Sequence, residues 1–183
     1  MRQEKCAQIF TNGNGFEVFI PIQDKSQAHQ GLKTFIHEIG IPEHLISDGA
    51  PEQGSPRTYK THWNSIVKRN HIHQTFIQPH CPFQNRAEQA IGHLGSAITT
   101  KSAKKKSPRR LWSFCGELCA NIRQRTASNN PSSMGRTPFE LVHGYRPDIT
   151  LYTSSEWYDF VFYYEKGDSS TRGVERLARW LGP

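Results

Sequence analysis

Two short stretches decide how this chain is interpreted: Ser-Asp-Gly-Ala at residues 47–50 and Pro-His-Cys-Pro-Phe-Gln-Asn-Arg-Ala-Glu at residues 79–88. Asp48 follows a short apolar run and precedes a glycine, which predicts the end of a strand. Glu88 is predicted in the first turn of a long helix. A carboxylate at a strand end and another on a nearby helix can converge on a divalent cation, as metal-dependent phosphoryl transfer requires. Taken without its flanking residues, the Asp48-Gly49 pair has a second interpretation as an ordinary turn, because most Asp-Gly dipeptides form turns.

The flanking residues resemble those of retroviral-type integrases. The stretch at 79–88 is similar to the P-x-S-P-x-x-N-x-x-E approach to the last acid of their Asp-Asp-Glu triad, and residues 47–49 are similar to the segment around the second acid. Residues 135–141, with a following Gly144 and Pro147, resemble the box that follows the core in long-terminal-repeat retrotransposons. The resemblance extends over about residues 5–150 and is to the integrase core of the copia-like branch.

This resemblance implies a fold, a reaction and a set of site residues. The implied fold is ribonuclease-H-like, and the reaction is polynucleotidyl transfer in which Mg²⁺ or Mn²⁺ activates water or a 3′-hydroxyl for attack on a DNA phosphodiester. By resemblance, Asp48 and Glu88 are catalytic acids and metal ligands. Asn85 is implied to orient the loop before Glu88 and to act at the nucleic-acid site. DNA or RNA is the implied partner, and family members act as homo-oligomers.

The first acid of the triad has no counterpart in this sequence. In the family it lies on the opening strand, one strand before a segment like residues 6–11, and Met1 comes only a few residues before that segment. Asn12 and Asp24 fall after later strands and do not replace it. We therefore expect an integrase fragment truncated at both ends, with weak metal binding and little or no turnover. The alternatives are a non-catalytic DNA- or RNA-binding module and a decayed gene relic.

Composition agrees with one modest globular domain plus extensions. The chain has 183 residues, of which 35% are hydrophobic and 21% charged, enough to bury a core. No apolar run approaches the ~20 residues of a membrane span. The four cysteines are too few and too scattered for a disulfide scaffold, which favours a reducing, intracellular setting. A nuclear location is expected if the protein is functional.

Positive charge is concentrated in one part of the sequence. Residues 89–139 hold nine basic residues against a single acid, Glu117, although the whole chain carries only +7. The densest part contains no acid and consists of Lys101, Lys104, Lys105, Lys106, Arg109 and Arg110. Such a run is typical of a strip that contacts phosphates. A solvated loop or a nuclear-import signal is the alternative.

Apolar periodicity predicts alternating strands and helices. Strands are expected at 5–11, 16–22, 44–47 and 72–77, the first two joined by a hairpin turn at 12–15. Helices are expected from a Ser26 cap to Gly40, around Trp63, over 84–100, after a Ser107 cap with Pro108 at the first helical position, and after a Thr137 capping box. The fold class is α/β: a ribonuclease-H-like mixed sheet flanked by helices and lacking its first strand, with a C-terminal β extension.

Two glycines, Gly92 and Gly95, share the helical strip of Glu88. Each costs roughly 1 kcal/mol in a helix interior, so they indicate either the close approach of another backbone or DNA, or close packing of the helix on the sheet.

The C-terminal residues differ in character from the rest. Residues 157–164 form a dense aromatic strand, and 176–183 read Arg-Leu-Ala-Arg-Trp-Leu-Gly-Pro. This resembles the opening of the small β-barrel that follows the core in some copia-like polyproteins. The predicted domains are residues 1–150, an N-terminally truncated integrase-type core, and residues 151–183, the incomplete start of that barrel.

Overall fold

The computed structural model describes residues 4–53, 62–77, 86–127, 133–165 and 173–183. It divides into two compact units, residues 1–93 and 94–183. The predicted domain boundary at 150 stays a prediction.

The first unit opens with an antiparallel hairpin of β1 (Cys6–Thr11) and β2 (Glu17–Ile22), in the register Gln8 opposite Ile20. Its turn is closed by the Asn12 side chain, whose Oδ1 accepts from the backbone N–H groups of Asn14 (2.9 Å) and Phe16 (3.0 Å). Gly15 takes a positive φ of 83°, which glycine adopts without a steric penalty. The predicted hairpin is confirmed.

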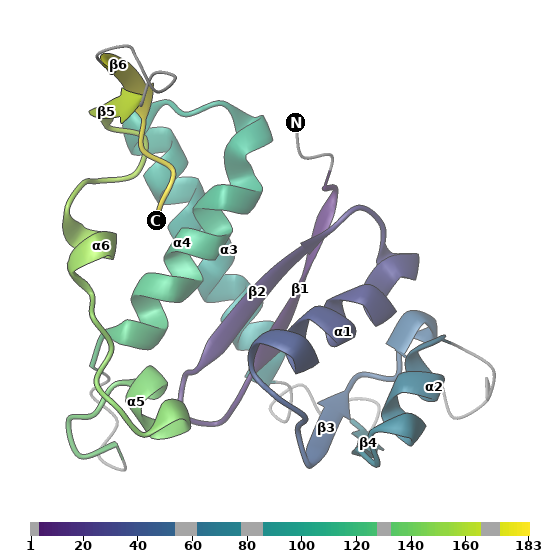
Figure 1. The fold of residues 1–183 in the computed structure, drawn as a ribbon. Coiled ribbons are helices and arrows are strands. Elements are labelled where there is room, and N and C mark those ends of the chain that lie inside the picture. The colour runs from purple at the N-terminus through teal and green to yellow at the C-terminus, as the bar shows by residue number, and fades with distance from the viewer. Residues whose placement is uncertain (1–3, 54–61, 78–85, 128–132, 166–172) are drawn as a thin grey trace. The chain divides into compact units, whose positions relative to one another are not determined.

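Helix α1 (Ala28–Glu38) packs against this hairpin, as Figure 1 shows. Its Leu32 is fully buried, and its Phe35 ring stacks on Phe10 with the ring centroids 4.5 Å apart. The predicted Ser26 cap is wrong. A 3₁₀ turn at Lys25–Gln27 precedes the helix, and the Asp24 carboxylate caps that turn by accepting from the Ser26 N–H at 2.9 Å.

A second pair of strands in the first unit is parallel. β3 (His44–Ser47) pairs with β4 (His73–Phe76), and α2 (His62–Arg69) lies between them in sequence, so the connection is of the βαβ type. A short 3₁₀ turn at Pro51–Gln53 follows β3. The apolar face of α2 is buried through Trp63, Ile66 and Val67. These elements confirm the prediction for this region.

Helix α3 (Arg86–Lys105) begins in the first unit and ends in the second. In the second unit it is followed by a 3₁₀ turn at Arg109–Leu111 and by α4 (Trp112–Arg125), whose Cys115, Leu118 and Cys119 are buried. The predicted Ser107 cap is wrong, because the residue before the 3₁₀ turn is Pro108 and makes no side-chain cap. The Ser107 hydroxyl instead accepts a 3.0 Å hydrogen bond from the indole N–H of Trp157.

The predicted N-cap at Thr137 is confirmed. Thr137 Oγ1 accepts from the Glu140 N–H at 3.1 Å and starts α5 (Pro138–His143), which ends at Gly144 in the left-handed conformation with φ 78°. A single further turn, α6 (Thr150–Thr153), follows.

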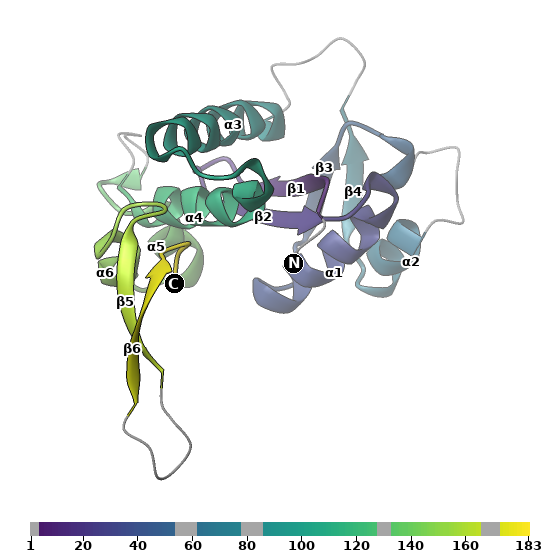
Figure 2. The same ribbon diagram turned by 90° about the horizontal axis from the view of Figure 1, so that it is seen from above.

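The chain ends in an antiparallel hairpin of β5 (Phe160–Glu165) and β6 (Val174–Arg179). In Figure 2 this hairpin projects from the helices of its own unit. Most of its side chains are exposed, including the rings of Phe160, Phe162 and Tyr164, whereas Trp157 just before it is buried.

The architecture is mixed α/β, as predicted. The described residues form three two-stranded sheets, β1–β2, β3–β4 and β5–β6, and no described strand pairs with both β1 and β3. No helix formed by these residues is long and apolar enough to cross a membrane.

Candidate functional site

Asp48 lies where the sequence places it, directly after the last residue of β3. Its carboxylate is exposed, and Oδ1 accepts from the Ala50 N–H at 3.2 Å, which makes a local turn of the Asx type. Gly49 has a φ of 74°, and a Cβ there would contact the Phe76 ring at 3.4 Å. The turn interpretation is confirmed, and the turn fixes an exposed carboxylate at the strand end; the catalytic and metal-binding role of Asp48 stays a prediction.

A hydrogen-bond network around Gln74 holds the backbone that precedes and follows Asp48. Gln74 Nε2 donates to Ser47 Oγ at 3.2 Å and to the Gln53 carbonyl at 2.9 Å. Its Oε1 accepts from the Trp63 indole N–H at 3.3 Å. Strand β4 and helix α2 thus fix both the end of β3 and the 3₁₀ turn beyond Asp48.

Glu88 lies in the first turn of α3 and is exposed. The start of this helix is tied to the β1–β2 hairpin, because Arg86 Nη1 donates to the Gly13 carbonyl at 2.9 Å. The first-turn position favours a carboxylate, since the unpaired N–H groups of a helix start carry partial positive charge.

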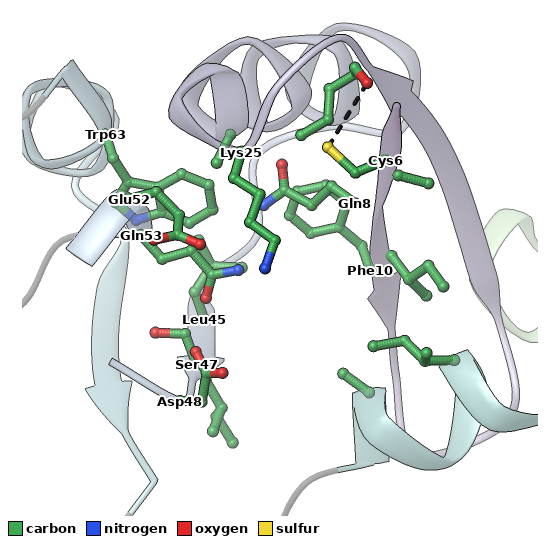
Figure 3. A pocket seen from close by; sticks show the side chains of 17 residues that line it. Cys6, Gln8, Phe10, Lys25, Leu45, Ser47, Asp48, Glu52, Gln53 and Trp63 are labelled. Atoms are coloured by element: carbon green, nitrogen blue, oxygen red, sulfur yellow. Dashed lines mark hydrogen bonds between the residues drawn. The ribbon is translucent and has the colours of Figure 1, made fainter. Parts of the chain in front are cut away.

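A pocket of about 280 Å³ brings β1, β3 and α3 together within the first unit. Figure 3 shows Gln8 and Phe10 of β1 across the pocket from Leu45 and Asp48, with the Lys25 side chain pointing into the space. From α3 the lining residues are Ala87 and Ile91, the neighbours of Glu88 on its helix. Asp48 is therefore a pocket residue, whereas Glu88 is next to one and is not itself part of the lining.

The oxygen donors around this pocket are of the kind that binds a hard cation, but they are few. Carboxylate oxygens are the ligands that Mg²⁺ prefers. Among the residues that the structure describes, however, no three His, Cys, Asp or Glu side chains group as a metal site would require. Asn85, predicted beside Glu88, lies outside the described residues.

The predicted basic run lies in the second unit, at the end of α3 and the start of the following 3₁₀ turn. Two of its members have acidic partners: Lys105 Nζ lies 2.7 Å from Glu156 Oε2 and 2.7 Å from Asp159 Oδ1, and Lys104 Nζ lies 3.5 Å from Glu156 Oε2. Hydrogen bonds to Asp159 and, to a smaller extent, to Glu156 raise the pKa of Lys105. The same contacts lower the pKa values of both acids.

The other four members have no ion pair among the described residues: Lys101, Lys106, Arg109 and Arg110. Lys106, Arg109 and Arg110 are exposed and Lys101 is half-buried. Lys105 is thus ion-paired within the protein, whereas these four cations have no acidic partner among the described residues.

Comparison with known proteins identifies the fold. No family model and no curated protein matches this sequence. Among solved structures, the chain is similar to the catalytic core domain of BIV integrase, with TM-score 0.54 and 18% identity over 72% of this chain and 80% of that one. It is also similar to the HTLV-2 integrase catalytic core domain in complex with magnesium, in a trimeric form, with TM-score 0.56 and 11% identity over 75% of this chain and 93% of that one. The fold is that of a retroviral integrase catalytic core.

The integrase-core likeness extends over most of the chain. A chain in the simian T-cell lymphotropic virus intasome structure, a complex with PP2A regulatory subunit B56 gamma, matches 95% of this chain and 66% of its own length, with TM-score 0.57 and 16% identity. The predicted ribonuclease-H-like class is confirmed by these neighbours. The copia-like assignment and the truncation stay predictions.

Several residues around the integrase-core pocket were not predicted from the sequence. Gln8, Lys25 and Trp63 line it with Asp48, but they come from three separate elements and carry no shared motif.

Proposed function

We propose that this protein is an integrase-core relative, of retrotransposon origin, that binds DNA through Lys101, Lys106, Arg109 and Arg110. The observation that carries the proposal is that these four cations lie at the end of α3 and in the turns that follow it, and have no acidic partner among the described residues. Each such cation that neutralises a phosphate releases condensed counterions, which drives binding at low salt. The integrase-core fold supports DNA as the polyanion, and one structural neighbour comes from an intasome.

We further propose that the carboxylates of Asp48 and Glu88 hold Mg²⁺ or Mn²⁺ weakly. The HTLV-2 neighbour is described in complex with magnesium, and oxygen donors suit this ion. When bound, the cation would supply activation of water or a 3′-hydroxyl for attack on a phosphodiester. With two carboxylates in place of a fuller set of ligands, we expect weak affinity and little or no turnover. Self-association is part of the same proposal, because that neighbour is trimeric.

DNA binding is tested by filter binding of a radiolabelled 30-base-pair duplex over a series of salt concentrations. The variant K106A/R109A/R110A should bind more weakly, and the slope of log affinity against log salt should fall by up to about 2.7, since each phosphate contact contributes about 0.9. K5A/K33A/R69A, which removes three exposed cations of the first unit, is the charge-matched control and should change the slope little.

The result that contradicts the proposal is an unchanged salt slope in the triple variant. RNA bound with the same slope and higher affinity would instead favour the non-catalytic RNA-binding alternative. The absence of a cooperative thermal transition in the wild-type protein would favour a decayed relic.

The metal proposal makes a separate prediction. Millimolar Mn²⁺ should raise the melting temperature of the wild-type protein, because a ligand that binds only the folded state stabilises it. Asp48→Asn and Glu88→Gln should each remove most of that shift, whereas Glu38→Gln, an exposed acid on α1, should leave it unchanged. Equal shifts in all four proteins would show that the ion acts elsewhere.

A further inference from the structure

Two of the four cysteines lie together inside the second unit. Cys115 and Cys119 are four residues apart on α4, so their side chains leave the same face of the helix. Cys115 is 0% exposed and Cys119 is 5% exposed, and both are free thiols. The DNA and divalent-metal binding proposed above uses neither of them.

A polar group of α3 faces this thiol pair. Ser102 Oγ donates to Cys115 Sγ over 4.0 Å. Two cysteines that only filled space in an apolar core would need no such donor, because thiols pack there as small apolar groups. Ser102 is half-buried, so a single side chain separates the Cys115 sulfur from solvent. This side of the pair gives an ion a short route to the thiols.

The surroundings favour the thiolate form of Cys115. The hydrogen bond that Cys119 donates is the largest influence and lowers the pKa of Cys115, and burial opposes it. The Ser102 hydrogen bond and the charge of Lys101 lower that pKa further. Because Cys119 is the donor in the shared hydrogen bond, its own pKa is raised. A cation in place of the shared proton would bind both sulfurs at once.

The helical spacing of the two thiols does not suit a disulfide. Side chains at i and i+4 of a helix have Cβ atoms about 5–6 Å apart, whereas a disulfide requires about 3.5–4.5 Å. Two metal–sulfur bonds in line, each about 2.3 Å as in zinc thiolates, hold the sulfurs about 4.6 Å apart. A bridging ion therefore fits between the thiols without moving the helix backbone.

The number of donors selects the kind of ion. In the part of the chain that the structure describes, no third His, Cys, Asp or Glu side chain joins the two thiols. A structural zinc ion takes four such ligands. Thiolates are soft ligands that select Cu⁺, and Cu⁺ binds two of them in a linear arrangement. Burial of the pair excludes water as a further ligand.

We propose that Cys115 and Cys119 form a two-coordinate site for the soft monovalent cation Cu⁺. On binding, two Cu–S bonds form, the two thiol protons leave to solvent, and the copper keeps its oxidation state. The bis-thiolate complex carries one negative charge, which the Lys101 ammonium group offsets, since its charge acts on both thiols. The site requires neither DNA nor Mg²⁺ or Mn²⁺.

The test uses the full chain with the substitutions C6S/C81S, which leave Cys115 and Cys119 as the sole cysteines. Cu⁺ is added without oxygen, as its acetonitrile complex, in the presence of the chelator bathocuproine disulfonate, whose colour reports the copper that it retains. We expect this variant and the wild type each to withdraw one Cu⁺ per chain. Copper K-edge X-ray absorption of the loaded variant should show two sulfur neighbours and no nitrogen or oxygen neighbour.

The variant C115S/C119S is the matched control, because it removes the same number of thiols and keeps the other two cysteines. It should bind Cu⁺ at least about hundredfold more weakly than C6S/C81S. One equivalent of Cu⁺ should also raise the melting temperature of C6S/C81S, because an ion that binds only the folded state stabilises it.

Three outcomes overturn the proposal. If neither C6S/C81S nor the wild type withdraws copper from the chelator, the site does not exist. Equal affinity of the two double variants would mean that any pair of thiols in this chain binds the ion. A melting temperature of C6S/C81S that falls on addition of Cu⁺ would show that the ion binds the thiols of the unfolded chain.

Discussion

Lys105 connects the predicted basic run to two acidic residues that come just before the C-terminal hairpin. Its ammonium group is shared between Glu156 and Asp159, and neither acid is close to it in sequence. A charge count of the sequence treats this lysine as equivalent to Lys106, but their roles differ. Lys106 is exposed and has no ion pair among the described residues, whereas Lys105 stabilises the second unit.

The shared ion pair predicts a pH dependence of stability. The Lys105 hydrogen bonds lower the pKa values of Asp159 and Glu156 below their ordinary 3.8 and 4.5. The stabilisation is therefore present above these values and is lost as pH falls through the lowered pKa values of the folded state. Thermal melts from pH 7 to pH 2 should show wild type more stable than Lys105→Met at neutral pH, with the difference vanishing at the acid end.

At alkaline pH the stability contribution of this ion pair changes with pH in the opposite direction. Because the pKa of Lys105 is raised above 10.5, its contribution is present below that value and is lost only as pH rises through the raised pKa. Lys104→Met is the control, since its contact with Glu156 is longer, at 3.5 Å. An acid limb identical in wild type and Lys105→Met would contradict this assignment.

Helix α3 carries two glycines that its surroundings do not require. A Cβ built on Gly92 or on Gly95 meets nothing within 4 Å among the described residues. Both interpretations of the sequence, close approach of another backbone or DNA and close packing on the sheet, stay predictions.

This openness predicts that Gly92→Ala and Gly95→Ala each stabilise the protein by about 0.4–1 kcal/mol, because alanine restricts the unfolded chain and favours the helix. Urea denaturation measures the change. Gly144→Ala, at a helix end with φ 78°, should instead destabilise by about 1 kcal/mol. If the alanines stabilise the helix but weaken DNA binding, the glycines serve close approach of the nucleic acid.

Local signals in the sequence predicted the strands and helices better than they predicted which residues cap the helices. The strands and the helices followed from apolar periodicity, and the Thr137 cap was correct because both of its partners lie within one turn. Ser26 and Ser107 were wrong for different reasons. Asp24, two residues earlier, competes as an acceptor for the first, and a tryptophan fifty residues away uses the hydroxyl of the second. Asp48 was placed correctly, but the pocket around it unites elements that only the fold brings together.

At the scale of the whole molecule, the chain consists of two units that share helix α3. Each has its own buried residues: Leu32 and Trp63 in the first, Cys115 and Trp157 in the second. We therefore expect the stability of one unit to change without an equal change in the other.

Trp157→Ala tests this expectation. The substitution removes a side chain that is 2% exposed and hydrogen-bonded to Ser107, at a cost of about 3–5 kcal/mol. Hydrogen exchange followed by mass spectrometry should show faster exchange in α4 and α5 and little change in β1, β2 and α1. Equal acceleration in both units would mean that they unfold together.

The position of Trp63 has an optical consequence. It is the sole tryptophan among residues 1–93, its indole lies in the pocket lining, and its N–H is bonded to Gln74. Replacing the other three tryptophans with phenylalanine would leave one fluorophore whose emission wavelength reports the polarity of that pocket. Because this indole is only 2% exposed, unfolding of the first unit would then be seen as a red shift, in real time and without a label.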